Sequence, residues 1–198
     1  MNTFQIIAFD ADDTLWHNES LYATGRERFR EIMARYGLHD ISDEQVDAIE
    51  IRNLPLYGYG VMSFVLSLTE AAIFMTQGRV TGSDLQALLD HGKEMLSAEV
   101  QLFDHVEETL ASLSADYPLM MITKGDLQHQ QAKVENSGLS GYFRHVEVVS
   151  DKSPETYARI MERHGLDASR FLMVGNSLKS DILPVVRLGG WAVYIPNE

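Results

Sequence analysis

Two carboxylates that could bind a metal ion or attack a substrate follow the first apolar run of the chain. Asp10 and Asp12 come directly after Phe4–Phe9, and Thr14 follows them. Residues two apart in an extended segment point the same way, so both carboxylates can face one ligand. Neighbouring carboxylates repel each other and need a cation, for which Mg²⁺ with oxygen ligands is the natural choice. A solvated acidic turn has the same composition, so this cluster alone does not decide between the two interpretations.

Polar residues also end the next two apolar runs. The run Leu119–Thr123 ends in a hydroxyl, and Lys124 and Gly125 follow where a helix is expected to begin. A hydroxyl and backbone N–H groups at a helix start can cradle a phosphate, although Thr123 could instead cap that helix. Lys152 follows the third run and could neutralise a phosphoryl oxygen. A plain surface lysine is the alternative there.

The fourth apolar run is followed by a glycine and two further oxygen ligands. Asn176 and Asp181 lie in this loop, directly after Phe171–Val174 and Gly175. A Gly-rich turn with a polar cap is the alternative interpretation. Ligands of an open parallel sheet bind beyond the carboxyl ends of its strands, so all four polar clusters are expected at one edge.

The elements that must position these residues are buried strands alternating with amphipathic helices. Five apolar runs lack strict alternation, as parallel strands covered on both faces do. They are Phe4–Phe9, Leu119–Thr123, Val146–Val149, Phe171–Val174 and Ala192–Ile195. The alternation predicts an α/β fold: a doubly wound, parallel-sheet, Rossmann-like core.

A long helical stretch interrupts this rhythm between the first two strands. Its candidate helices are Leu21–Tyr36, Asp43–Arg52, Val61–Gln77 and Ser83–Ser97. We therefore predict a catalytic core formed by residues 1–15 and 103–198, with a helical insertion formed by residues 16–102. Tyr57, Tyr59 and Phe64 are candidates for substrate selection by the insertion, although aromatic residues on helices usually pack in a core.

Composition limits the partners of this chain of 198 residues. Its formal net charge is −13, which disfavours nucleic acid or an anionic membrane as a partner. A phosphorylated substrate would be repelled at long range, so its site must supply local positive charge. There are no cysteines, no apolar stretch near the roughly 18 residues of a spanning helix, and no secretory signal pattern. We expect a cytoplasmic protein, and the sequence leaves its oligomeric state open.

The ordered set of polar clusters resembles the haloacid dehalogenase superfamily, most of whose members are phosphatases. Asp10-x-Asp12-x-Thr14 looks like the first motif of that family, Thr123 the second and Lys152 the third. The fourth resembles Gly175-Asn176 with Asp181 after it. The insertion is similar to the α-helical cap of the family. The chain departs from the usual pattern where Lys124 replaces asparagine and Asn176 replaces an acid.

The resemblance implies a mechanism and a role for each residue. Asp10 would attack phosphorus and form an aspartyl-phosphate, while Asp12 would serve as general acid and base. Thr123, Lys124, Gly125 and Lys152 would bind the phosphoryl group of a small phosphorylated metabolite. Asp10, Asp12 through its backbone carbonyl, and Asn176 would hold Mg²⁺, and Asp181 would bind the ion directly or through water. Which of Asn176 and Asp181 is the direct ligand stays open.

Three other functions remain possible at this level. A 2-haloacid dehalogenase would use Asp10 to displace halide, but that reaction needs no second acid, and Asp12 argues against it. A phosphomutase would share the aspartyl-phosphate. A non-catalytic binding protein of the same fold would not need Asp10, Asp12, Thr123 and Lys152 together. The sequence does not identify the substrate, nor whether a short C-terminal tail follows the fifth strand.

Overall fold

The computed structural model describes residues 3–196, which form two compact units. The α/β unit comprises Met1–His17 and Val100–Glu198, and the helical unit comprises Asn18–Glu99. The roles of catalytic core and cap that we predict for these two parts of the chain stay predictions. Each unit is described by itself below.

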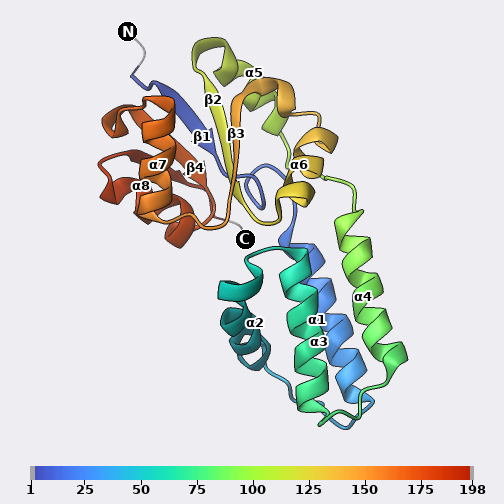
Figure 1. Ribbon diagram of the computed structural model, residues 1–198. Coiled ribbons are helices and arrows are strands. Elements are labelled where there is room, and N and C mark those ends of the chain that lie inside the picture. The colour runs from blue at the N-terminus through green and yellow to red at the C-terminus, as the bar shows by residue number, and fades with distance from the viewer. Residues whose placement is uncertain (1–2, 197–198) are drawn as a thin grey trace. The chain divides into compact units, whose positions relative to one another are not determined.

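The α/β unit is built on one parallel sheet of five strands (Figure 1). Its strands are β1 (Ile6–Phe9), β2 (Leu119–Lys124), β3 (Phe143–Val149), β4 (Phe171–Gly175) and β5 (Trp191–Tyr194). Their order across the sheet is β3-β2-β1-β4-β5, and every pairing is parallel. The predicted α/β class with a parallel, doubly wound sheet is therefore confirmed.

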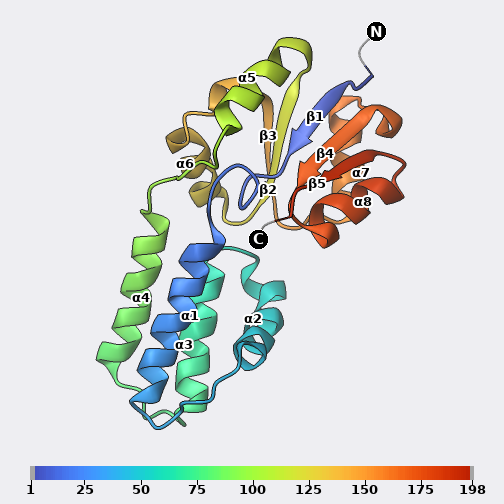
Figure 2. The same ribbon diagram turned by 180° about the vertical axis from the view of Figure 1, so that it is seen from behind.

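Helices cover both faces of this sheet (Figure 1 and Figure 2). Helices α5 (Val106–Asp116) and α6 (Leu127–Asn136) pack on one face, and α7 (Pro154–His164) and α8 (Leu183–Arg187) on the other. Side chains of β1 alternate between the two cores, because successive residues of a strand point to opposite faces. Ile7 and Phe9 belong to the first core, and Ile6 and Ala8 to the second.

The edge strands differ most from the apolar runs that predict them. β3 begins at Phe143, upstream of the apolar run that predicts it. The first part of the strand alternates between buried and exposed positions, as an edge strand allows, so it does not appear as an apolar run. β5 is shifted by one residue toward the N-terminus and is largely exposed. Met120 and Met121 in β2 are fully buried, because this strand lies inside the sheet.

Four helices form the helical unit around a core of their own (Figure 1). They are α1 (Glu19–Ala34), α2 (Asp43–Tyr57), α3 (Val61–Met75) and α4 (Gly82–Leu96). α2 continues past its predicted end through Pro55 and stops at Gly58, whose positive φ of 72° ends the helix. Phe64 lies 0% exposed in this core, so its prediction as a substrate contact is wrong.

The two segments that join the helical unit to the sheet lie side by side in the α/β unit. Trp16 forms a bridge with Leu102, and the His17 N–H donates to the carbonyl of Gln101 at 2.9 Å. Among residues 3–196, no helix is long and apolar enough to cross a bilayer.

Candidate active site

The order of the strands creates the place where the candidate residues meet. The chain passes from β1 to β2 and β3, then crosses to the other side of β1 to form β4. A crevice opens at the carboxyl ends of strands where the order reverses in this way. Asp10 directly follows β1, and its N–H donates to the Val174 carbonyl of β4 at 2.9 Å. Asp10, the candidate nucleophile, therefore lies at the point where the strand order reverses.

A buried lysine joins two buried carboxylates there. Lys152 Nζ donates to Asp10 Oδ1 and, at 2.7 Å, to Asp181 Oδ1. Lys152 is 3% exposed, Asp10 7% and Asp181 1%. Buried charges are tolerated when they are paired and hydrogen-bonded, as these are. The interpretation of Lys152 as a plain surface lysine is wrong.

The pKa values reflect this burial and pairing. Burial raises the pKa of Asp10 to about 6, with Lys152 opposing the rise and Asp181 adding to it. Burial alone would lower the pKa of Lys152, but the carboxylates of Asp10 and Asp181 raise it above its ordinary value. Lys152 thus remains a cation in a place where water provides little screening.

The loop after β1 fixes the second oxygen of Asp10. The Thr14 hydroxyl donates to Asp10 Oδ2 at 3.0 Å. A tight turn brings it there, with Asp13 at a φ of 59° and the Leu15 N–H donating to the Ala11 carbonyl at 2.8 Å. Both carboxylate oxygens of Asp10 therefore have donors, and its orientation is set.

Asp181 reaches the site through a turn of π-helix, Leu178–Ile182, that precedes α8. The Ser177 N–H donates to Asp181 Oδ2 at 2.9 Å, so Asp181 is also held at both oxygens. Its carboxylate packs directly on the backbone of Gly175. Sequence analysis placed Gly175 in a turn and in the fourth motif, and the structure adds this packing role.

The end of β2 adds a buried hydroxyl and a second lysine. Thr123 is 1% exposed, and it does not cap α6, because the side chain of Asp126 accepts from the His129 N–H at 2.9 Å instead. Lys124 Nζ donates to Ser180 Oγ at 3.3 Å. Burial, and then the nearby Lys152, lower the pKa of Lys124, while Asp10 raises it.

The Gly125 N–H, predicted to bind phosphate, donates to the Val149 carbonyl at 3.3 Å, and Gly125 has a φ of 143°. The hydroxyl of Thr123 and the ammonium of Lys124 are thus the side-chain groups with which this strand end could bind an anion.

The carboxylate of Asp12 lies in a different hydrogen-bond network from that of Asp10. Its Oδ1 accepts from Trp16 Nε1 at 2.7 Å and from Lys133 Nζ at 2.5 Å, and its Oδ2 accepts from Gln130 Nε2 at 2.9 Å. Sequence reasoning missed Gln130 and Lys133. In the sequence, only their spacing of three residues could have indicated them, because this spacing places two side chains on one helix face.

The oxygen ligands at the carboxyl edge of the sheet suit a hard cation. Asp10 and Asp181 contribute two carboxylates against one bridging ammonium, and Asn176 and the Asp12 carbonyl would add neutral oxygens. Oxygen ligands of this kind are those that Mg²⁺ takes. Within residues 3–196, no group of three or more His, Cys or acidic side chains is arranged as a metal site. A site here would therefore depend on the neutral oxygens too.

Most of the chain, from β1 through α8, matches a family of known proteins. Residues 4–189 match the model of the haloacid dehalogenase-like hydrolases. The chain belongs to this family. It is a hydrolase of the haloacid dehalogenase type, and the resemblance inferred from its motifs is confirmed.

Individual members of the family are similar over nearly the whole chain. A phosphoglycolate phosphatase of Vibrio parahaemolyticus is 29% identical over 193 residues, which are 93% of this chain and 80% of the relative. The N-acylneuraminate-9-phosphatase of Mus musculus is 23% identical, over 92% of this chain and 78% of its own. These two relatives of the hydrolase are named as phosphatases.

Solved structures of the family agree in fold. A haloacid dehalogenase-like family hydrolase from Xanthomonas campestris is 42% identical with a TM-score of 0.94, over 98% of this chain and 82% of its own. Three 2-haloacid dehalogenases and one further dehalogenase also share the fold, with TM-scores from 0.61 to 0.69. They are 18% to 22% identical, which shows the fold alone.

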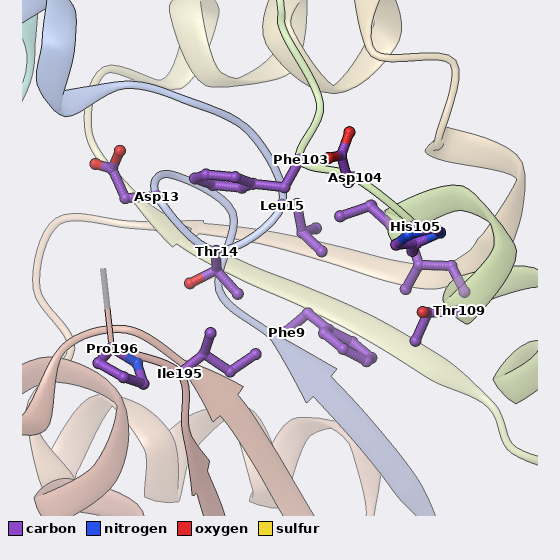
Figure 3. Close-up of a pocket in the computed structure, with 12 residues that line it drawn as sticks. Phe9, Asp13, Thr14, Leu15, Phe103, Asp104, His105, Thr109, Ile195 and Pro196 are labelled. Atoms are coloured by element: carbon purple, nitrogen blue, oxygen red, sulfur yellow. The ribbon is translucent and has the colours of Figure 1, made fainter. Parts of the chain in front are cut away.

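A separate pocket of about 330 Å³ lies in the α/β unit of this hydrolase (Figure 3). Its walls are mainly apolar and include Phe9, Leu15, Leu110 and Ile195. Thr14 also lines it, while the Lys152 cluster does not. The pocket is therefore distinct from the charged site.

The imidazole of His17 lies against the Phe103 ring with 4.0 Å between the ring centroids. His17 is exposed.

Proposed function

We propose that this hydrolase is a Mg²⁺-dependent phosphatase that cleaves a small phosphorylated metabolite through an aspartyl-phosphate on Asp10. The observation that carries the proposal is the buried Lys152 ammonium joined to both Asp10 and Asp181, with Thr123 and Lys124 at the neighbouring strand end. The two relatives named as phosphatases support it. The role of the helical unit as a cap that selects the substrate belongs to the same proposal.

Asp10 is the nucleophile in this mechanism. Lys152 and Thr14 each bind one of its oxygens and so hold the carboxylate in a fixed orientation. A bond forms from an Asp10 oxygen to phosphorus while the ester P–O bond breaks. Holding the reacting groups in place in this way is a large part of phosphoryl-transfer catalysis.

Positive charge at the site must overcome the repulsion between a carboxylate and a phosphate dianion. Lys152 and Lys124 supply it from two adjacent strand ends, in a protein with a net charge of −13. The Thr123 hydroxyl can donate to a phosphoryl oxygen. Preorganised donors of this kind stabilise charge that develops in the transition state.

Asp10, Asp181, Asn176 and the Asp12 carbonyl would hold Mg²⁺, which when bound neutralises phosphoryl oxygens and so assists attack. Protonated Asp12 gives its proton to the leaving oxygen. It then takes a proton from the water that attacks the aspartyl-phosphate, which releases inorganic phosphate and restores Asp10. Atoms and protons balance over the two steps.

Hydrolysis of phosphorylated metabolites with and without Mg²⁺, with 2-chloropropionate as a haloacid control, tests the proposal. We expect inorganic phosphate to be released from at least one metabolite in Mg²⁺ and none in excess EDTA. Mass spectrometry of the acid-quenched protein should find added phosphate on the peptide that contains Asp10. Halide release without any phosphate release would contradict the proposal and favour the dehalogenase.

A further inference from the structure

Helix α6 presents two polar side chains, one turn apart, to the carboxylate of Asp12. Lys133 Nζ lies 2.5 Å from Asp12 Oδ1, and Gln130 Nε2 lies 2.9 Å from Asp12 Oδ2. Trp16, which lies in the same loop as Asp12, also donates from Nε1 to Asp12 Oδ1 at 2.7 Å. Three donors on two oxygens leave the carboxylate one orientation. We refer to Trp16, Gln130 and Lys133 as the Asp12 clamp.

The clamp is rigid because its members are packed. Gln130 is 2% and Trp16 1% exposed, and the Lys133 side chain is 12% exposed. A long lysine side chain normally loses much rotamer freedom when it is held in this way.

Gln130 also controls the hydroxyl of Thr123. Its Nε2 lies 2.7 Å from Thr123 Oγ1 and 2.9 Å from the Lys124 carbonyl, in addition to Asp12. Carboxylate and carbonyl oxygens only accept, so the amide nitrogen, and not the amide oxygen, must face them. The two N–H groups of the amide are shared among these three oxygens, and the shortest contact is the one to Thr123 Oγ1. The amide nitrogen cannot accept, so Thr123 Oγ1 accepts from Gln130 and its own proton is left for another acceptor.

One further observation sets Gln130 apart from ordinary packing. Its Oε1 is buried and accepts no hydrogen bond from the described residues. A buried polar atom without a partner is unfavourable, and an apolar side chain of similar size would avoid it. The amide is thus better explained by what its nitrogen orients than by stability.

We propose that Gln130 and Lys133 are positioning residues of the phosphatase. Lys133 holds Asp12 in line for proton transfer, and Gln130 holds Asp12 and aims the Thr123 hydroxyl at the phosphoryl group. The proposal rests on the proposed function, because it assigns Asp12 and Thr123 the roles given there. Neither positioning residue needs to touch the substrate.

The indole N–H of Trp16 reports on the clamp without any need for turnover. The protein has two tryptophans, and the second, Trp191, donates to the Ser169 carbonyl at 3.0 Å in another part of the α/β unit. In ¹⁵N-labelled protein, Lys133→Met should shift the Trp16 indole resonance and leave that of Trp191 in place. Lys93→Met, at an exposed lysine of α4, should shift neither. An unchanged Trp16 resonance in Lys133→Met would show that the clamp does not exist.

The dependence of rate on the leaving group separates positioning from mere structural support. Phenyl phosphate needs more help from a proton donor than 4-nitrophenyl phosphate, whose leaving group departs readily. For the single-turnover transfer step, Lys133→Met should lose at least tenfold more rate with phenyl phosphate than with 4-nitrophenyl phosphate. Lys133→Arg should recover most of the loss. Equal losses with both esters would overturn the role of Lys133.

Gln130→Met tests the second half of the proposal. It should lower the affinity for inorganic phosphate, measured by calorimetric titration with Mg²⁺ present, by about tenfold, because Thr123 is no longer oriented. Gln131→Met on the exposed face of the same helix is the matched control and should bind as wild type does. Wild-type affinity in Gln130→Met would refute the control of Thr123.

Failure of the proposed function gives a different result. Wild-type protein would then hydrolyse neither ester, and the positioning roles would fall with the function. The Trp16 resonance would still decide whether the clamp itself is present.

Discussion

Asp181 packs so closely on Gly175 that a Cβ atom at residue 175 would lie 2.5 Å from the Asp181 Cγ. Real Cβ atoms do not approach a side chain at this distance, and the contact is with a carboxylate that is itself fixed by Lys152 and the Ser177 N–H. The absence of a side chain at Gly175 is therefore a condition for the charged site. A small substitution at Gly175 therefore tests whether Asp181 is held in this position.

Gly175→Ala should displace Asp181 and destabilise the fold by about 1–3 kcal/mol, the usual effect of overpacking. It should also weaken Mg²⁺ binding in calorimetric titration, because Asp181 is a proposed ligand. Gly141→Ala is the matched control, since a Cβ at residue 141 would have nothing within 4 Å. Unchanged stability and Mg²⁺ affinity in Gly175→Ala would mean that Asp181 is not held as described.

Asp10→Asn should abolish turnover and leave the fold intact, because an amide is a poor nucleophile of almost the same shape. Circular dichroism and thermal unfolding should show a folded protein, and no phosphate should appear on the Asp10 peptide after acid quench. Hydrolysis near the wild-type rate would exclude Asp10 as the nucleophile.

Lys152→Met should lower kcat/KM by about 100- to 1000-fold, the effect of removing one preorganised charge-stabilising donor. It should also destabilise the protein by about 3–5 kcal/mol, because Asp10 and Asp181 would remain buried without their cation. Urea unfolding measures the second effect.

The double variant Lys152→Met with Asp181→Asn separates the two effects of losing Lys152. It removes one buried charge of each sign, so it should recover much of the stability and none of the activity. Recovery of activity along with stability would assign Lys152 a structural role only.

Lys124→Asn should weaken binding of inorganic phosphate about tenfold or more. Lys124 lies at the end of β2, where burial and then the nearby Lys152 lower the pKa of Lys124. Removing its charge leaves Lys152 as the one cation of this pair. Calorimetry at constant Mg²⁺ measures the change, and wild-type affinity would place Lys124 outside the substrate site.

Asn176→Asp should tighten Mg²⁺ binding, because a carboxylate offers the ion an anionic oxygen where a neutral amide now stands. The metal-free protein should become less stable, since another negative charge would lie near Asp10 and Asp181. Calorimetry and thermal unfolding in EDTA measure the two changes. Equal Mg²⁺ affinity in both proteins would leave Asp181 as the ligand from this loop.

The sequence by itself determined the fold class and the identity of most candidate site residues. Parallel strands are buried on both faces, so they appear as apolar runs, and their carboxyl ends must lie at one edge. The order of these runs along the chain was therefore enough to assign the polar residues that follow them to a common site. In the structure Lys152 is hydrogen-bonded to Asp10 and Asp181, while the hydroxyl of Thr123 contacts Gln130 at the neighbouring strand end. Their roles in catalysis stay predictions.

Only the tertiary structure decided what each of these groups contacts. The rule that residues two apart share a face holds for extended chain, but Asp12 already lies in the turn whose Thr14 and Leu15 N–H groups donate to the Ala11 carbonyl. The sequence therefore could not show that the carboxylate of Asp12 is hydrogen-bonded to Gln130 and Lys133. Which face of α6 meets the loop depends on how the helix packs against the sheet. Asp181 likewise comes close to Gly175 only because of the path that the π-helical turn takes. Packing distances of this kind have no periodicity in sequence, and they emerge only when the chain is folded.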